Sequence, residues 1–147
     1  MELIFYAPVW GQSGFEQLSR GLILALDQMG VDIELRPSQD WNAEKVGLSQ
    51  ITMSRLLRMM NKRVNPLAPH VIYQIPRGQP VTPDAPVICY TLFETERCPQ
   101  PWMEALMKMD KLLVFSEFNR KGWIDSGIPE EKIATLPAAV DSFTYNP

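Results

Sequence analysis

The sequence predicts an α/β fold in which a mainly parallel β-sheet carries helices on both faces. Short runs rich in β-branched and aromatic residues alternate with longer segments whose apolar residues recur at the helical period. This order is typical of parallel sheets crossed by helices. The strand-like runs are also apolar on both faces, as expected where helices cover both sides of the sheet. Together these observations indicate a Rossmann-like, doubly wound domain.

Length and composition restrict the class of protein. A chain of 147 residues predicts a single domain spanning residues 1–147. The net charge of −3 argues against a nucleic-acid-binding surface, because neutralising a phosphate backbone needs clustered Lys and Arg. The N-terminus leads directly into a strand-like run, without the basic lead of a signal peptide, and no apolar run approaches the roughly 20 residues that span a bilayer. We therefore expect a cytoplasmic protein without a transmembrane segment.

Six segments have the composition of buried strands, and each ends at a proline, a polar loop or a helix start. Only residues 76–85, three of them proline, join the third segment to the fourth. A parallel crossover usually needs a dozen or more residues, so either this link is a bare loop or one of the two strands is antiparallel. We favour the bare loop. The predicted strands are residues 2–7, 31–35, 70–75, 86–91, 112–115 and 133–136.

Four segments have the helical period. The first begins at Ser13, whose hydroxyl can accept the N–H of residue 16 while Glu16 reaches back, as in a capping box. It ends before Gly30, which suits a left-handed cap, and its apolar stripe is Phe15, Leu18, Leu22, Leu26 and Met29. The other helices are predicted over residues 48–62, 102–109 and 117–125, with a short turn at 129–132.

Two groups of side chains on these helices have an ordinary structural interpretation. Basic residues recur at helical spacing on the second helix, which favours a solvated face over a nucleic-acid site. These residues are Arg55, Arg58, Lys62 and Arg63, and the apolar side of the same helix is predicted as Leu48, Ile51, Leu56 and Met60. Trp102 and Trp123 also stand at helical positions, where a place in the core is expected.

Chemistry in an open parallel sheet is expected beyond the carboxyl ends of the strands. The candidate segments are residues 8–14, 76–78, 93–96 and 116–119. In the first, Gly11, Gln12, Ser13 and Gly14 precede a helix whose free N–H groups suit a phosphate or a sugar hydroxyl. The alternative is a tight strand-to-helix turn, and the dinucleotide-binding spacing is absent. Trp10, in the same loop, either stacks on a sugar or lies in the core.

Two carboxylates, Glu94 and Glu96, follow the fourth strand. Glu94 is the better candidate for a site, where it would bind sugar hydroxyls or act as a general base. Glu96 and Arg97 also fit solvated loop charges. With a strand order of 3-2-1-4-5-6, the first and fourth strands would be neighbours and Glu94 would lie beside the glycine loop. Further polar candidates, Ser116 and Asn119, follow the fifth strand.

Other reactive residue types do not form a catalytic pattern in the sequence. His70, the only histidine, stands at the start of a strand, the wrong end for catalysis in this fold, so a surface or capping role is favoured. There is no triad and no cluster with metal-ligand spacing. Cys89 is expected in the core, and Cys98 is expected to be exposed.

Several short strings, in this order and spacing, resemble the N-terminal half of family-4 glycosyltransferases with the GT-B fold. The strings are residues 90–99 with Trp102, residues 110–118, residues 126–133, and Pro137 with Val140–Asp141. The resemblance implies the acceptor-binding domain of a retaining enzyme. Such an enzyme moves a sugar from a nucleotide-sugar donor to an acceptor hydroxyl, without a metal or another cofactor.

The chain departs from that family in two ways. Many members carry a histidine after the fourth strand, where this chain has Phe93 and Glu94, so the details of catalysis cannot be carried over. The family's C-terminal, donor-binding domain has no counterpart, which implies an isolated domain that is inactive alone, lacks its C-terminal partner domain and self-associates weakly. The alternative is a stand-alone Rossmann-like binding or interaction module without transferase activity.

Overall fold

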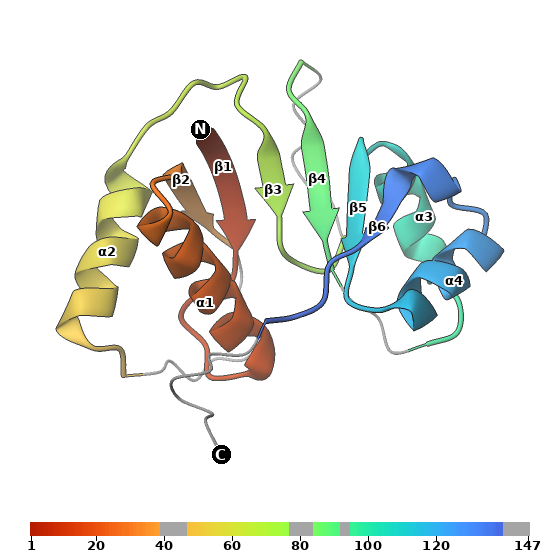
Figure 1. The fold of residues 1–147 in the computed structure, drawn as a ribbon, viewed down its shortest axis with the longest axis horizontal. Coiled ribbons are helices and arrows are strands. Elements are labelled where there is room, and N and C mark those ends of the chain that lie inside the picture. The colour runs from red at the N-terminus through yellow and green to blue at the C-terminus, as the bar shows by residue number, and fades with distance from the viewer. Residues whose placement is uncertain (39–46, 77–83, 92–94, 140–147) are drawn as a thin grey trace.

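A computed structural model describes residues 1–38, 47–76, 84–91 and 95–139. It shows an α/β fold with one six-stranded sheet in which all paired strands are parallel (Figure 1). The strands are β1 (Glu2–Ala7), β2 (Asp32–Pro37), β3 (His70–Ile72), β4 (Val87–Tyr90), β5 (Lys111–Val114) and β6 (Ile133–Thr135). The helices are α1 (Gly14–Gln28), α2 (Gln50–Asn61), α3 (Gln100–Met107) and α4 (Glu117–Asp125), followed by a 3₁₀ turn, η1 (Glu130–Lys132).

The predicted fold class is confirmed, but the strand order is β2-β1-β3-β4-β5-β6. In the order 3-2-1-4-5-6, the chain would add β2 and β3 on one side of β1 before it crosses β1 and adds β4 on the other side. Here only β2 lies on that side, and after α2 the chain crosses β1 and adds β3 on its other side. The third strand therefore pairs with β1, and it separates β1 from β4. The predicted adjacency of the first and fourth strands is wrong, and the order reverses between β1 and β3 instead.

The link between β3 and β4 joins two parallel strands. Val71 pairs in register with Ile88, which excludes the antiparallel alternative. The described parts of this link, residues 73–76 and 84–86, contain no helix. The prediction of a bare loop therefore holds for these parts.

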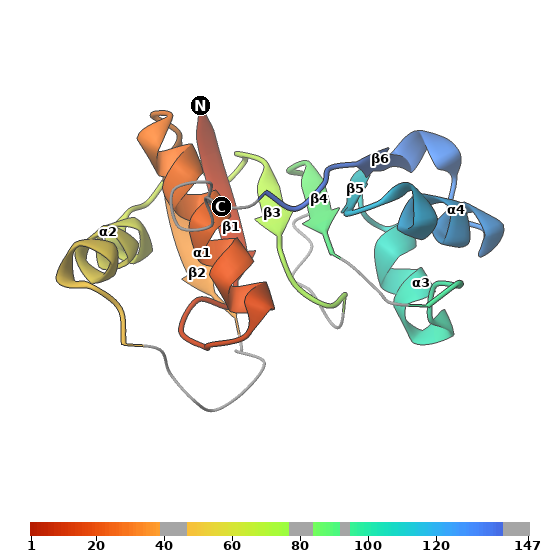
Figure 2. The ribbon, with the colours of Figure 1, turned by 60° about the horizontal axis from the view of Figure 1, so that its bottom comes forward.

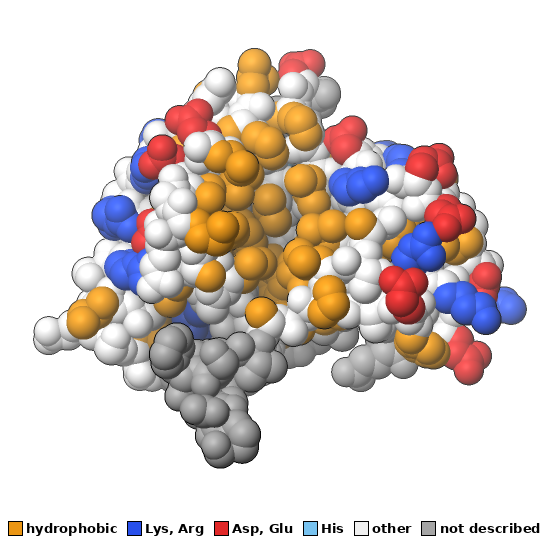
Figure 3. All heavy atoms as spheres, viewed as in Figure 1, with side chains coloured by type: hydrophobic (Ala, Val, Ile, Leu, Met, Phe, Trp, Pro, Cys, Tyr) orange, Lys and Arg blue, Asp and Glu red, His pale blue; other side chains and the backbone are white. Residues whose placement is uncertain are grey.

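Two apolar clusters lie on opposite faces of the sheet. Phe5 and Leu35 pack with Ile23 of α1, whereas Cys89 and Leu112 pack with helices α3 and α4. In Figure 2, α1 and α2 accompany β1 and β2, and α3 and α4 accompany the other half of the sheet. Figure 3 shows hydrophobic side chains gathered in the middle of the face that carries α1.

Trp102 and Trp123 lie in the core as predicted, and Cys89 is buried. Cys98 is only 5% exposed, so its predicted exposure is wrong. Its N–H donates to the Ser126 hydroxyl at 2.8 Å, and this bond draws the start of the α3 segment onto α4.

Helix α1 ends as predicted but buries a different side. Gly30 has a φ of +82°, as a left-handed cap requires. The buried positions are Glu16, Ser19, Arg20 and Ile23, while the apolar stripe that begins at Phe15 is only half-buried and Met29 is exposed. Ser13 is the N-cap, but its hydroxyl donates to Glu16 instead of accepting a backbone N–H. The Ser13 half of the predicted capping box is therefore wrong, whereas Glu16 does reach back to Ser13.

The basic residues of α2 tie the helix to its neighbours. Arg55 and Arg58 pair with Asp27 of α1 at 2.6 and 2.5 Å, and Lys62 pairs with Asp32. Burial alone would raise the pKa of Asp27, but the bonds from the two guanidinium groups lower it overall. The predicted solvated face is thus wrong for Arg55, which also bonds to the Leu24 carbonyl.

The apolar side of α2 also differs from the prediction. Leu56 and Met59 are buried, whereas Ile51 is 74% exposed. Only part of the predicted apolar side of this helix therefore faces the core.

His70 lies at the amino end of β3, as predicted, but it is buried and not on the surface. Its Nδ1 lies 3.5 Å from the Tyr6 hydroxyl, and its Nε2 lies 3.3 Å from the Pro66 carbonyl oxygen. None of the described helices is long and apolar enough to cross a membrane.

Candidate functional site

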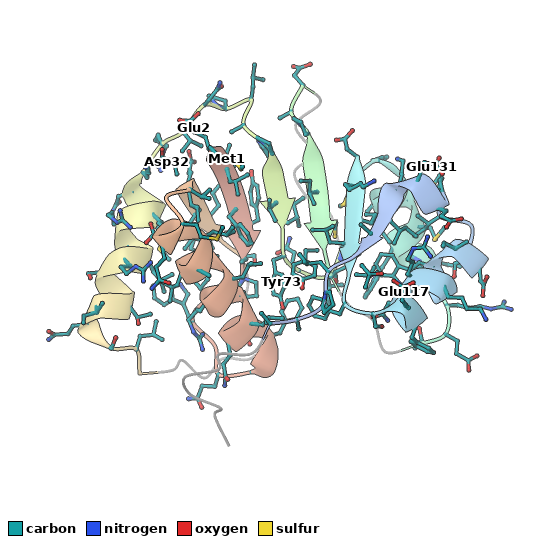
Figure 4. All side chains as sticks on the ribbon, in the orientation of Figure 1. Met1, Glu2, Asp32, Tyr73, Glu117 and Glu131 are labelled. Atoms are coloured by element: carbon teal, nitrogen blue, oxygen red, sulfur yellow. The ribbon has the colours of Figure 1, made fainter. Side chains whose placement is uncertain are left out.

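The strand order places the switch point at the carboxyl ends of β1 and β3. The loop from Pro8 to Ser13 leaves β1 there and leads into α1. Tyr73 follows β3 at the same edge, and Figure 4 shows it between α1 and the ends of the central strands. We therefore take this edge as the candidate site.

Side chains of α1 hold the loop in place. Ser19 donates to the Pro8 carbonyl, and Arg20 Nη1 donates to the carbonyls of Val9 and Gly11 at 2.9 and 2.7 Å. Ser19 and Arg20 are both buried. These bonds explain why polar residues occupy the buried side of α1: they satisfy carbonyl groups of the loop that turns over the sheet.

A buried carboxylate stands at the first turn of α1. Glu16 is 0% exposed and accepts a hydrogen bond from the Ser13 hydroxyl. A Cβ atom placed on Gly11 would lie 2.7 Å from the Glu16 carboxyl carbon, so a larger residue there would require the Glu16 side chain to shift. The partial positive charge of the helix N-terminus thus already faces a carboxylate.

Four aromatic rings surround the end of β3. The Phe15 ring stacks on the Tyr73 ring at a centroid distance of 4.4 Å, and Tyr90 meets the same ring edge-on at 5.4 Å. Phe115 contacts Tyr90 at 4.6 Å, also edge-on. The Tyr90 hydroxyl donates to the Leu136 carbonyl at 2.9 Å. By contrast, the buried Tyr73 hydroxyl has no hydrogen-bond partner among the described residues.

The acid–base properties of the site follow from burial. Burial raises the pKa of Tyr73, and the nearby Tyr90 and Glu16 raise it further. Burial also raises the pKa of Tyr90 to about 12. Both hydroxyls therefore stay protonated at neutral pH; the Tyr90 hydroxyl donates to the Leu136 carbonyl, and the Tyr73 hydroxyl is available as a donor. Burial raises the pKa of Cys98 to about 11, so its thiol is not a nucleophile at neutral pH.

The other candidates in the glycine loop lie at the same edge. Gln12 is exposed, and its carbonyl accepts from the Gln17 side chain at 3.1 Å. Gly14 is exposed and begins α1. Trp10 is half-buried and packs against the core cluster beneath α1, which fits the core alternative.

The candidates after β5 form a helix cap. The Ser116 hydroxyl accepts the Asn119 N–H at 3.2 Å and donates to the Asn119 side-chain oxygen at 3.1 Å. Both residues therefore have a structural role at the start of α4.

Of the two carboxylates after β4, Glu94 lies outside the described residues and Glu96 is exposed. The backbone of Glu96 lies against α4, because a Cβ on Gly122 would be only 2.5 Å from the Glu96 carbonyl oxygen.

A separate surface pocket of about 460 Å³ lies between β2 and α2, and the sequence did not point to it. Glu34 is buried there and pairs with Arg36 at 2.8 Å and with Arg63 at 4.0 Å. The one feature of the sequence that could have indicated this pocket is Glu34, a carboxylate inside an apolar strand. The pocket contains none of the predicted site residues and its charges are paired, so the edge at β1 and β3 remains the stronger candidate.

Tyr73→Phe separates a ligand-binding role from a structural role. The hydroxyl is buried without a described partner, so its removal should leave the melting temperature unchanged or slightly higher. If the hydroxyl donates to a bound ligand, affinity should fall about fivefold to thirtyfold. Titration of ligand into both proteins, with thermal unfolding alongside, tests this. Unchanged affinity would contradict a ligand-binding role of the Tyr73 hydroxyl.

Among the described residues, no group of three or more His, Cys, Asp or Glu side chains could hold a metal ion. Comparisons with protein-family models, with curated proteins and with solved structures gave no match to this chain.

Proposed function

We propose that this chain is the acceptor-binding half of a retaining glycosyltransferase, which transfers a sugar from a nucleotide-sugar donor to an acceptor hydroxyl. The observation that carries the proposal is the polar and aromatic edge at the switch point. There a buried carboxylate, aromatic rings and a tyrosine hydroxyl without a hydrogen-bond partner among the described residues meet beyond the ends of β1 and β3. The order of short strings along the chain supports the same assignment.

The charge at this edge favours a neutral hydroxyl ligand over a phosphate. A phosphate at the N-terminus of α1 would meet the Glu16 carboxylate, which faces Gly11 and Ser13. The negative charges of the phosphate and the carboxylate would repel each other, whereas a sugar hydroxyl can donate a hydrogen bond to the carboxylate. Of the two ligands suggested by the glycine loop, the sugar hydroxyl is therefore the one we propose.

The partners follow from this assignment. The donor would be bound by a C-terminal domain, so the 147-residue chain alone should bind acceptor sugars weakly and transfer none. Catalysis in the whole enzyme would involve Glu94. We propose a cytoplasmic enzyme that needs no metal.

The test is ligand binding by the purified 147-residue chain. Saturation-transfer NMR should show contact with neutral oligosaccharides and much weaker contact with UDP-glucose or GDP-mannose. Incubation with these donors and the oligosaccharides should give no product. Turnover above a buffer blank, or a preference for the nucleotide sugars, would contradict the proposal.

The second candidate is a stand-alone binding module. It is favoured by the half-exposed apolar face around Val71 and Leu113, because such faces often mark interaction sites. The natural reading frame distinguishes the two. A frame that continues past Pro147 into a domain of similar size supports the transferase, and a frame that stops there supports the module.

A further inference from the structure

One face of the sheet is covered by a helix over only part of its width. The register places Val71 of β3 in line with Phe5 of β1, which packs beneath α1, and with Ile88 of β4. Leu113 of β5 lies on the same face, in line with Tyr90. Val71, Ile88 and Leu113 are half-buried, whereas Phe5 is buried. No described helix covers these three residues.

The apolar stripe of α1 forms one wall of this area. Phe15, Leu18 and Leu22 are half-buried and pack against the same core cluster as Val71 and Leu113. We call the floor of Val71, Ile88 and Leu113, with this wall, the front groove. Figure 3 shows its position as hydrophobic surface between α1 and the strands beside it.

The strand order explains why the groove is open. Crossovers between parallel strands are right-handed, so crossovers in opposite directions place their helices on opposite faces. The step from β1 to β2 runs one way and puts α1 on the front face. The steps from β4 to β5 and from β5 to β6 run the other way and put α3 and α4 behind. A parallel sheet is normally covered by helices on both faces, but the described part of the chain supplies no helix over the front groove.

The size of the groove matches one helix. Three strands about 4.8 Å apart are spanned by a helix of about 10 Å diameter, and four residues of strand give a length of about 13 Å. A stable dimer buries about 800 Å² on each partner, several times the area of this floor. A single docked helix therefore fits better than the face of a second copy.

The described helices do not supply such an element from a second copy. An inserted helix must expose apolar residues three, four and seven positions apart. The exposed large apolar side chains of the described helices are Ile51 and Leu57, six positions apart on α2, Met107 on α3 and Phe118 on α4. None of these helices has an exposed apolar stripe. The occupant is therefore sought in another protein.

An exposed lysine lies at the edge of the groove. Lys111 pairs in register with Ile88 and is exposed, and its amino group lies 2.6 Å from the Glu131 carbonyl oxygen. We propose that the front groove binds an amphipathic helix of a partner protein, with an apolar stripe on the floor and an Asp or Glu beside Lys111. The floor of the groove lies on the face of the sheet, and its wall residue Phe15 also stacks on Tyr73 at the carboxyl edge.

The probes are two fluorescently labelled helical peptides of 16 residues. Both carry Leu at positions i, i+3, i+4, i+7 and i+11, flanked by Glu in one peptide and by Lys in the other. Anisotropy titration of the 147-residue chain should show binding of the Glu peptide and weaker binding of the Lys peptide. Lys111→Gln should reduce this preference. Leu113→Gln should weaken both peptides about tenfold.

Two further variants separate docking from loss of fold. Val71→Thr keeps the side-chain shape and adds a hydroxyl to the floor, so it should also weaken binding. Ile51→Gln, on the exposed side of α2, should leave binding unchanged. Absence of binding, or equal losses in Leu113→Gln and Ile51→Gln, would overturn the proposal.

Two results would assign the groove to a different occupant and overturn the partner helix. One is a dimer in sedimentation that Leu113→Gln abolishes, which would indicate a second copy. The other is loss of peptide binding in a longer natural form of the chain, which would indicate a helix of that same chain.

Discussion

Gly122→Ala is expected to lower the melting temperature by roughly 5–10 °C, corresponding to about 2–3 kcal/mol. A Cβ at this position of α4 would lie 2.5 Å from the carbonyl oxygen of Glu96 and 3.0 Å from its carbonyl carbon. The obstructing atoms belong to the backbone, so no side-chain rotation relieves the clash. The helix and the segment after β4 must therefore separate. Thermal unfolding by circular dichroism measures the loss.

Gly21→Ala is the matched control, because it makes the same change within a helix without a clash. Gly21 is exposed in α1, and a Cβ there would meet no atom within 4 Å. Alanine in a helix interior is favoured over glycine by about 0.5–1 kcal/mol, so this variant should be more stable than the natural chain. Equal destabilisation by both substitutions would show that the contact between Gly122 and Glu96 does not hold the segment after β4 against α4.

The elements that the sequence predicted best have local signals at their ends. The prediction for α4 matches the observed helix, Glu117–Asp125, because Ser116 caps its start and Gly127, with a φ of +101°, ends it. The end of α1 at Gly30 follows the same rule. These ends depend on residues next to each other in the chain, and such signals are readable without the tertiary structure.

The features that were missed depend on contacts between distant parts of the chain. Arg20 is buried because it bonds to loop carbonyls nine and eleven residues away in sequence. Cys98 is buried because its N–H donates to the hydroxyl of Ser126, which lies 28 positions away in the sequence. The strand order likewise depends on how many strands the chain adds on one side of β1 before it crosses to the other side. Local composition does not determine this number. Hydrophobic periodicity alone assigns none of these residues correctly.

The candidate site was found only in part for the same reason. The glycine loop and the start of α1 were predicted, but Tyr73 and Tyr90 were placed in strands and not considered for the site; Tyr90 does end β4, whereas Tyr73 follows β3. A usable signal was present, because Tyr73 and Tyr90 follow Ile72 and Cys89, which pair in register. Tyrosines at the carboxyl ends of two neighbouring strands, at the same level, predict an aromatic row at that edge of the sheet.

Glu94→Gln is expected to have the largest effect on activity, in the complete enzyme of which we propose this chain to be a part. A general base contributes about 10²–10⁴ to the rate, so kcat/KM should fall at least about a hundredfold. Glu94 lies outside the described residues, but Tyr90 and Thr91, just before it, are buried at the end of β4. Glu96→Gln is the matched control, because its side chain is exposed and should leave turnover near that of the natural enzyme.

The corrected strand order changes what a ligand at Glu94 must contact. Because β3 lies between β1 and β4, the ends of β1 and β4 are about 10 Å apart, two strand spacings. A sugar bound by both the Gly11 loop and Glu94 therefore crosses the end of β3, where Tyr73 lies. The double variant Tyr73→Phe with Glu94→Gln should then lose less activity than the two single losses combined, since both side chains act on one ligand.

The measurement is kcat/KM together with the melting temperature for the Glu94→Gln, Glu96→Gln and Tyr73→Phe variants and for the double variant. Near-natural turnover of Glu94→Gln would remove this residue from the site. Equal losses in the two glutamate variants would indicate a shared electrostatic effect of the loop, because a specific contact acts through one carboxylate only. If the double variant loses as much activity as the two single losses combined, the Tyr73 and Glu94 side chains do not act on the same ligand. The ligand would then not cross the end of β3.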